Sequence, residues 1–183
     1  MAIKRGTYSK AAGVFALAAW AAAAAAAGPE ITVKGGTFFA GDDVMLSLGA
    51  NLGLPLGAYV VAGGAVGYDR LPNTYDYAYP SYSVPLLGRV RVALPGGVVY
   101  PTAHAEGGVA VSNHRAYDEY GQVGYDHQTV NPLFNVGAGL GFAVAPQLDF
   151  LAETGYRQEW RERWDREIRR YVYLNAGVAF KLE

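Results

Sequence analysis

Apolar and polar side chains alternate with a period of two through most of residues 30–183, and this alternation limits the chain to β-strands. In V44-MLSLGANLG-L54, every second residue is Val, Leu or Ala, and those between are Met, Ser, Gly and Asn. Successive side chains of a strand point to opposite faces, so each segment has one apolar face. The rule recurs in segments that predict eight strands, at 31–40, 44–54, 56–69, 84–94, 98–112, 132–144, 148–160 and 171–182.

Charged residues occupy only one face of these segments. The apolar faces hold none, whereas the opposite faces hold nine: Lys34, Asp69, Arg89, Arg91, Glu106, Asp149, Glu153, Arg157 and Glu159. The charged faces are also rich in Gly, Asn, Ser and Ala, which suit the lumen of a narrow barrel better than a water-exposed surface. The apolar faces would then contact lipid, where a charge at the bilayer midplane costs about 2–4 kcal/mol.

The connections between the segments alternate in length. After a short connection at 40–43, short turns at 54–55, 95–97 and 145–146 alternate with longer loops at 70–83, 113–131 and 161–168. Outer-membrane barrels have this rhythm, with periplasmic turns on one rim and external loops on the other. The sequence therefore predicts an all-β fold, an eight-stranded antiparallel up-and-down transmembrane β-barrel with both termini at the periplasmic rim.

The first 27 residues have a different composition. Lys4, Arg5 and Lys10 precede an uncharged run at 11–27 that ends in seven alanines, which predicts a cleaved signal peptide at 1–27 and a barrel at 28–183. Cleavage leaves 12 basic and 16 acidic residues, a net charge of about −4, so we expect no nucleic-acid partner. Without any Cys and with three scattered His, the chain predicts no cofactor and no metal site.

Two segments carry a family resemblance, D149-FLAETGYRQEW160 and Y171-VYLNAGVAF180. Together with the alternation, the loop rhythm and the leader, they resemble the small eight-stranded outer-membrane barrels of the OmpA/OmpX type. That family usually ends on an aromatic residue, whereas Lys181, Leu182 and Glu183 follow Phe180 here. The resemblance implies a non-enzymatic protein in the outer membrane of a diderm bacterium, which serves envelope integrity or surface interaction. We expect a monomer in contact with outer-membrane lipid and lipopolysaccharide.

The inward charges are candidates for a lumen network, because opposite charges in a nearly closed interior must pair to offset their desolvation. An open alternative is a narrow ion path through the lumen. The members we expect in the network are Lys34, Arg89, Arg91, Glu106, Asp149, Glu153, Arg157 and Glu159.

An enzyme is the second reading of the chain. His104 and Glu106 share a face, with Ser112 and His114 nearby, and some outer-membrane barrels modify lipid A by acyl transfer with such a set. Because His104 and Glu106 are predicted to point inward, we expect no catalytic residues. A third reading is a secreted soluble barrel that binds a small ligand, which the lumen-like polar faces disfavour.

The predicted loops offer two candidate binding surfaces. Tyrosines with small and acidic neighbours make adaptable contacts for an extracellular ligand or host surface, or they extend an aromatic girdle with Tyr68, Tyr156 and Trp160. These are Tyr75, Tyr77, Tyr79, Tyr82, Tyr117, Tyr120 and Tyr125. Asp118 and Glu119 are a weak candidate for calcium.

The second surface is the charged stretch around 161–170. Its alternating signs predict either a paired, water-exposed hairpin tip or arginines that grip lipopolysaccharide phosphates bidentately. The arginines concerned are Arg161, Arg163, Arg166, Arg169 and Arg170.

Overall fold

The computed structural model describes residues 28–41, 43–70, 82–117, 123–162 and 166–182. At residues 43, 114–117, 123–127, 161–162 and 166–167 the description covers the backbone but not the side chain. All statements below refer to these parts of the chain.

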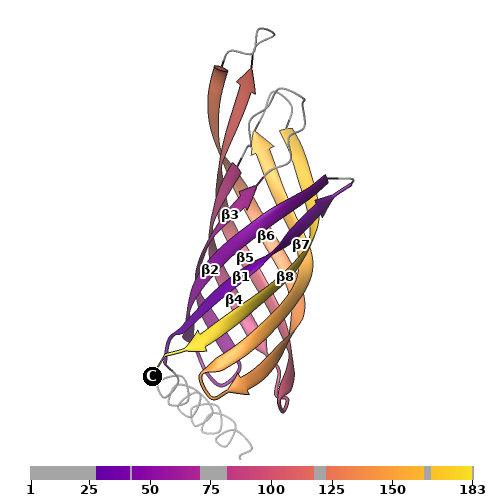
Figure 1. Ribbon diagram of the computed structural model, residues 1–183. Coiled ribbons are helices and arrows are strands. Elements are labelled where there is room, and N and C mark those ends of the chain that lie inside the picture. Colours follow the sequence, from indigo (N-terminus) through magenta and orange to yellow (C-terminus); the bar gives the residue numbers. More distant parts are fainter. Residues whose placement is uncertain (1–27, 42, 71–81, 118–122, 163–165, 183) are drawn as a thin grey trace, which may run out of the picture.

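The chain forms a closed barrel of eight antiparallel strands in sequence order (Figure 1). The strands are β1 (Glu30–Ala40), β2 (Asp43–Pro55), β3 (Val60–Arg70), β4 (Tyr82–Ala93), β5 (Val99–Tyr117), β6 (Val123–Ala145), β7 (Leu148–Glu162) and β8 (Arg166–Lys181). The predicted fold class is therefore confirmed. Among the described residues, no helix is long and apolar enough to cross a bilayer.

Antiparallel pairing of β1 with β8 closes the barrel, from Glu30 opposite Lys181 to Phe39 opposite Val172. The two ends of the described chain therefore meet at one rim, which we call the terminal rim. The connections 56–59, 94–98 and 146–147 also lie there. At the opposite rim, which we call the loop rim, Gly41 follows β1 and adopts a positive φ of 60°.

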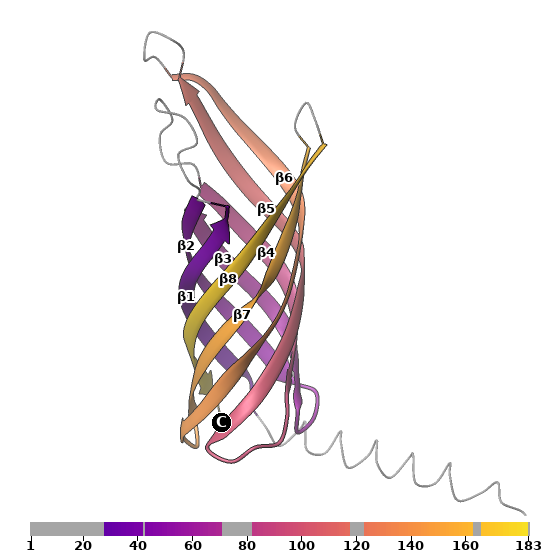
Figure 2. The ribbon, with the colours of Figure 1, turned by 90° about the vertical axis from the view of Figure 1, so that its right-hand side faces the viewer.

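Two hairpins project beyond the loop rim (Figure 2). The β5–β6 ladder continues to Tyr117 opposite Val123, although β4 pairs with β5 only as far as Asn113. The β7–β8 ladder likewise continues to Glu162 opposite Arg166, beyond the last β6–β7 pair at Glu159. The prediction of long loops at 113–131 and 161–168 is therefore wrong for most of both segments, because strand pairing extends through them.

The two faces of the barrel wall differ in polarity as the alternation predicts. The outer face is apolar and exposed, with residues such as Leu48, Val136 and Leu174. The inner face buries charged and polar side chains, including Arg89, Glu106 and Glu153. This arrangement is the reverse of a water-soluble barrel, whose charges face outward.

Toward the loop rim, apolar side chains fill part of the lumen. One cluster consists of Phe38, Met45, Tyr171 and Tyr173, and a second of Leu87, Ala110 and Leu133. The Phe38 and Tyr173 rings lie 5.5 Å apart, centroid to centroid. Charged side chains lie beside these clusters, as where Arg157 stacks on the Phe38 ring, and continue through the middle of the lumen to the terminal rim.

Candidate functional site

A cluster of charges crosses the middle of the lumen from four strands. Lys34 of β1 lies 2.9 Å from Glu106 of β5, and Arg89 of β4 reaches the same carboxylate at 2.5 Å. Arg89 also pairs with Glu153 of β7, whose second oxygen lies 3.7 Å from the Lys34 Nζ. Each carboxylate is thus shared by two cations. We call these four residues the central cluster.

Neutral groups complete the surroundings of the central cluster. The Asn135 amide donates to Glu106 at 2.6 Å, and His104 lies with its Nδ1 3.7 Å from Glu153. The other ring nitrogen of His104 shares a 2.5 Å hydrogen bond with the hydroxyl of Tyr173. The central cluster is therefore joined directly to the apolar cluster above it.

Glycines on β6 and β7 make room for this arrangement. A Cβ at Gly137 would overlap the Tyr173 hydroxyl and the Thr154 carbonyl, and one at Gly155 would overlap the same hydroxyl. The inward glycines therefore accommodate large polar side chains rather than leaving a water-filled tube.

A second ion pair lies nearer the loop rim. Arg157 of β7 reaches Asp69 of β3 at 2.5 Å, donates to Asn135 at 2.9 Å and stacks 3.8 Å above the Phe38 ring. Glu159 accepts a 3.0 Å hydrogen bond from Asn131. Sequence reasoning placed Asp69 on the polar face but left it out of the network.

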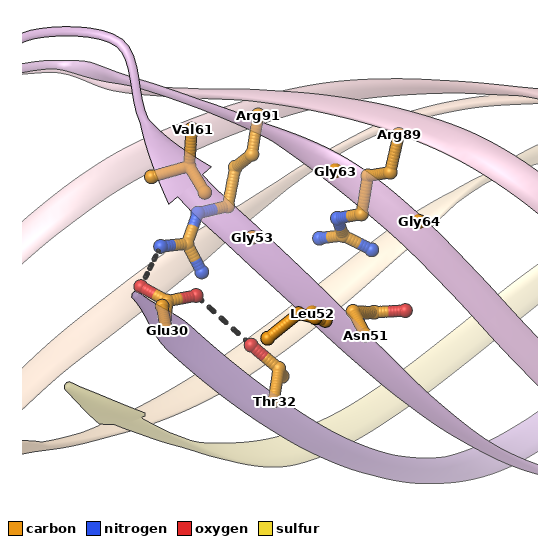
Figure 3. A pocket seen from close by; sticks show the side chains of 10 residues that line it. All are labelled: Glu30, Thr32, Asn51, Leu52, Gly53, Val61, Gly63, Gly64, Arg89 and Arg91. Atoms are coloured by element: carbon orange, nitrogen blue, oxygen red, sulfur yellow. Dashed lines mark hydrogen bonds and ion pairs between the residues drawn. The ribbon is translucent and has the colours of Figure 1, made fainter. Parts of the chain in front are cut away.

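The third group lies at the terminal rim. Arg91 pairs with Glu30 at 2.5 Å, and Asp149 accepts from Tyr100 at 2.5 Å and from Lys181 at 2.9 Å. Glu30 also accepts from Thr32 (Figure 3). Glu30 was missed because it precedes the alternating segment. The signal that could have found it is its even parity, which it shares with Lys34.

The charged side chains separate cavities at different heights of the lumen. A cavity of about 310 Å³ opens at the terminal rim. Above it, cavities of about 10 Å³ and 30 Å³ lie on either side of Asn51. The smaller one, between the Glu30–Arg91 pair and Arg89, is about the size of one water molecule (Figure 3). The sequence-predicted lumen charges thus point inward, and Asn135 joins the central cluster to the Arg157–Asp69 pair, while the Glu30–Arg91 and Lys181–Asp149 pairs lie apart at the terminal rim.

Among the described side chains, Ser112 and His104 do not form a nucleophile–base pair. Ser112 is fully buried and donates to Ser83, whereas His104 contacts Tyr173. The two are eight residues apart on β5, or about 26 Å at 3.3 Å per residue. The side chain of His114 lies outside the described residues. The described residues contain no cluster of His, Asp or Glu that could hold a metal ion.

Of the predicted surface residues, the structure places only some. Tyr82 stacks on Tyr68 with ring centroids 5.8 Å apart, which fits the girdle reading for this residue. Arg170 is exposed on β8 and Arg169 is partly buried. Arg161, Arg166, Tyr117 and Tyr125 have a described backbone within the hairpin strands. Five predicted side chains and the calcium candidates lie wholly outside the described residues: Tyr75, Tyr77, Tyr79, Tyr120, Arg163, Asp118 and Glu119.

Comparison with known proteins shows likeness in fold and not in sequence. No family model and no curated protein matches the chain. The neisserial surface protein A is similar in structure with a TM-score of 0.58 at 17% identity, covering 84% of this chain and 96% of that one.

Two further solved structures differ in what their proteins do. The outer-membrane enzyme PagL has a TM-score of 0.55 at 15% identity, with 81% of this chain and 97% of that one covered. Ail of Yersinia pestis, in complex with the heparin analogue sucrose octasulfate, has a TM-score of 0.50 at 10% identity, with 85% and 97% covered. The chain therefore has the fold of the small eight-stranded outer-membrane β-barrels.

Proposed function

We propose that the chain is a non-enzymatic integral protein of the outer membrane of a diderm bacterium. The observation that carries this proposal is the polarity of the barrel wall: exposed apolar side chains outside and buried charges inside. An exposed apolar face of this extent is costly in water and favourable in lipid. A charge on the same face would be destabilising in lipid. We further propose that residues 1–27 are a leader removed on export and that the mature barrel is a monomer.

The test is the behaviour of the purified protein with and without detergent. We expect it to need detergent for solubility, and to migrate faster unheated than boiled on a gel because the closed barrel is more compact. Full solubility without detergent together with equal mobility would contradict the proposal. Mass measurement of the exported protein would locate the new amino terminus, which we expect at Gly28.

The charges of the lumen favour a closed barrel over an open pore. The central cluster and the apolar clusters occupy the lumen, and the two cavities that adjoin Asn51 among the described residues are about 10 Å³ and 30 Å³. A hydrated ion needs a wider path than a one-water gap. Planar-bilayer recordings should therefore show no steady conductance.

For the physiological role we propose surface interaction through the projecting hairpins. Support comes from their extension beyond the barrel and from five arginines in or beside the β7–β8 hairpin: Arg161, Arg163, Arg166, Arg169 and Arg170. Arginine binds phosphate and sulfate groups bidentately. A barrel of the same fold, Ail, binds a sulfated sugar analogue. We therefore propose lipopolysaccharide phosphates as the first partner to test.

Replacement of the five arginines by Gln should weaken binding of purified lipopolysaccharide. The control replaces Lys181, a cation at the opposite rim whose side chain is 44% exposed, by Gln and should leave that binding unchanged. Unchanged binding by the five-residue variant would remove the proposed role.

The enzyme PagL has a similar fold, so the enzyme hypothesis needs an experiment of its own. Lipid A from cells with and without the protein should have the same acyl chains by mass spectrometry. A lost or added acyl chain would replace the non-enzymatic proposal by an acyl hydrolase or transferase.

A further inference from the structure

A cavity lined by described residues forms a cup at the terminal rim. Its volume is about 310 Å³, which falls in the range of small-molecule sites. Its inner end is the Glu30–Arg91 ion pair, behind which only the gap of about 10 Å³ continues (Figure 3). A molecule that enters from the terminal rim therefore stops at this pair.

The side chains that line the cup include two of each charge, and the proposed cleavage before Gly28 adds an α-ammonium to the lining. Glu30 and Asp149 provide two carboxylates, and Arg91 and Lys181 provide two cations. Two charged side chains keep hydrogen-bonding atoms without a partner among the described residues, the Arg91 Nε and the Asp149 Oδ1. Lys181 lies on the open side, with 44% of its side chain exposed, so it can move aside from Asp149.

The walls of the cup are apolar and ordered. Leu94, Pro95 and Pro55 line it together with the rings of Tyr59 and Tyr100. Backbone hydrogen bonds hold these turns in place, from Ala93 to the Tyr59 carbonyl at 2.7 Å and from Leu94 to the Pro101 carbonyl at 2.9 Å. The cup is thus largely pre-formed, with an apolar wall and a charged floor.

We propose that this cup binds a small zwitterion with an apolar body, of the size of an aromatic α-amino acid. The ligand ammonium takes the place of the Lys181 amine at Asp149, and its carboxylate binds Arg91 and the displaced Lys181. A zwitterion breaks one ion pair, Lys181–Asp149, and supplies a counterion for each of its members, so no side-chain charge of the cup is left unpaired. A ligand that carries only a positive or only a negative charge leaves one charge without a counterion in a mostly buried site, which is costly.

The site does not depend on the proposed membrane role, since it is formed within one barrel. If the terminal rim is the periplasmic rim, as the sequence predicts, the cup opens to the periplasm. Only this location depends on the proposed orientation. A failure of ligand binding and a failure of the detergent and gel test are therefore separate results.

The experiment titrates L-phenylalanine into protein purified in a non-ionic detergent from cells that express the full chain, with binding followed by calorimetry. Two probes each lack one charge: 2-phenylethylamine has no carboxylate and 3-phenylpropionate has no ammonium. We expect saturable binding of phenylalanine, and binding of each single-charge probe that is weaker by about tenfold or more. No saturable binding of phenylalanine, or equal binding of either single-charge probe, overturns the proposal.

Two variants locate the binding in the cup. Asp149→Asn removes the acceptor charge, and Tyr59→Ala truncates a wall residue that is 48% exposed, with the shift between unheated and boiled samples on a gel checking that each variant is folded. Each should weaken phenylalanine binding by about tenfold. The control Ser112→Ala changes a buried residue nearer the loop rim and should bind as the wild type does. Wild-type binding by Tyr59→Ala, which stays folded, or equal loss in Ser112→Ala contradicts the assignment to this cup.

Discussion

The inner and outer faces of the barrel come from alternate residues of the same strands, yet they follow opposite rules. On β6, Phe134 and Val136 are exposed on the outside, while the side chain of Asn135 between them is buried and bonded to Glu106 and Arg157. A charge added to the outer face would have no counterion in the lipid. Removal of a charge from the inner face would leave its counterions buried and unpaired. The wall therefore tolerates opposite kinds of substitution on its two sides.

The glycines of the two faces differ in the free space around their Cα atoms. Outside, Gly107 has no atom within 4 Å of an added Cβ, and Gly64 and Gly88 have one contact each. Inside, Gly137 and Gly155 lie directly beneath the Tyr173 hydroxyl. The inner face is packed around specific polar groups, whereas the outer face is open.

The largest expected effect is removal of a shared carboxylate from the inner face. Glu106→Ala leaves Lys34 and Arg89 without one of their acceptors in a buried site. We expect a loss of about 3–5 kcal/mol in the free energy of unfolding, measured by urea titration in lipid vesicles with tryptophan fluorescence. The control Arg170→Gln, at an exposed site, should change it by less than about 0.5 kcal/mol. If the two variants unfold alike, the inner charges do not stabilise the barrel.

A charge placed on the outer face should have the next largest effect. Val136 is 44% exposed and lies level with the central cluster, so Val136→Arg places a guanidinium deep in the lipid. The expected cost is about 2–4 kcal/mol in the same titration. Val130→Arg is the matched variant on the same face of β6 near the loop rim, where the cost should fall to about 0–1 kcal/mol. Equal costs at both depths would argue against a lipid-facing belt.

The smallest expected effect on stability is that of alanine substitution at glycines of the two faces. Gly137→Ala forces a methyl group into the Tyr173 hydroxyl and should destabilise the barrel by about 1–3 kcal/mol. Gly107→Ala meets open space and should be neutral or stabilise by up to about 1 kcal/mol, since alanine lowers the entropy of the unfolded chain. A loss of stability in Gly107→Ala as large as in Gly137→Ala would mean that the outer face is packed as tightly as the inner one.

Much of the barrel wall could be predicted because the alternation is strong wherever one face is apolar. Segment 44–54 and β2 (Asp43–Pro55) differ by one residue at each end. The projecting hairpins could not be predicted in this way. In 113–131 both faces of the strands are mostly polar, so the period-two signal disappears although the backbone pairing continues to Tyr117 and Val123.

The partners within the lumen could not be predicted either, although the inward position of the charges could. Arg157 meets Asp69, far away in sequence, because the stagger of the strands sets the height of each residue. Alternation gives the face of a residue but not its height along the barrel axis. The same limit explains why the contact of Lys181, at the end of the predicted segment 171–182, with Asp149 was not predicted.

The measurement that tests the central claim most directly is a spin-label scan along β2. The chain has no cysteine, so single cysteines from Leu46 to Leu54 can be labelled without background. In reconstituted vesicles, we predict that labels at even positions collide with oxygen far more than with a polar nickel reagent, and that labels at odd positions are shielded from lipid. Nickel access at Leu48 and Leu52 equal to that of a water-exposed site, or no two-residue period, would contradict an apolar outer wall around a charged lumen.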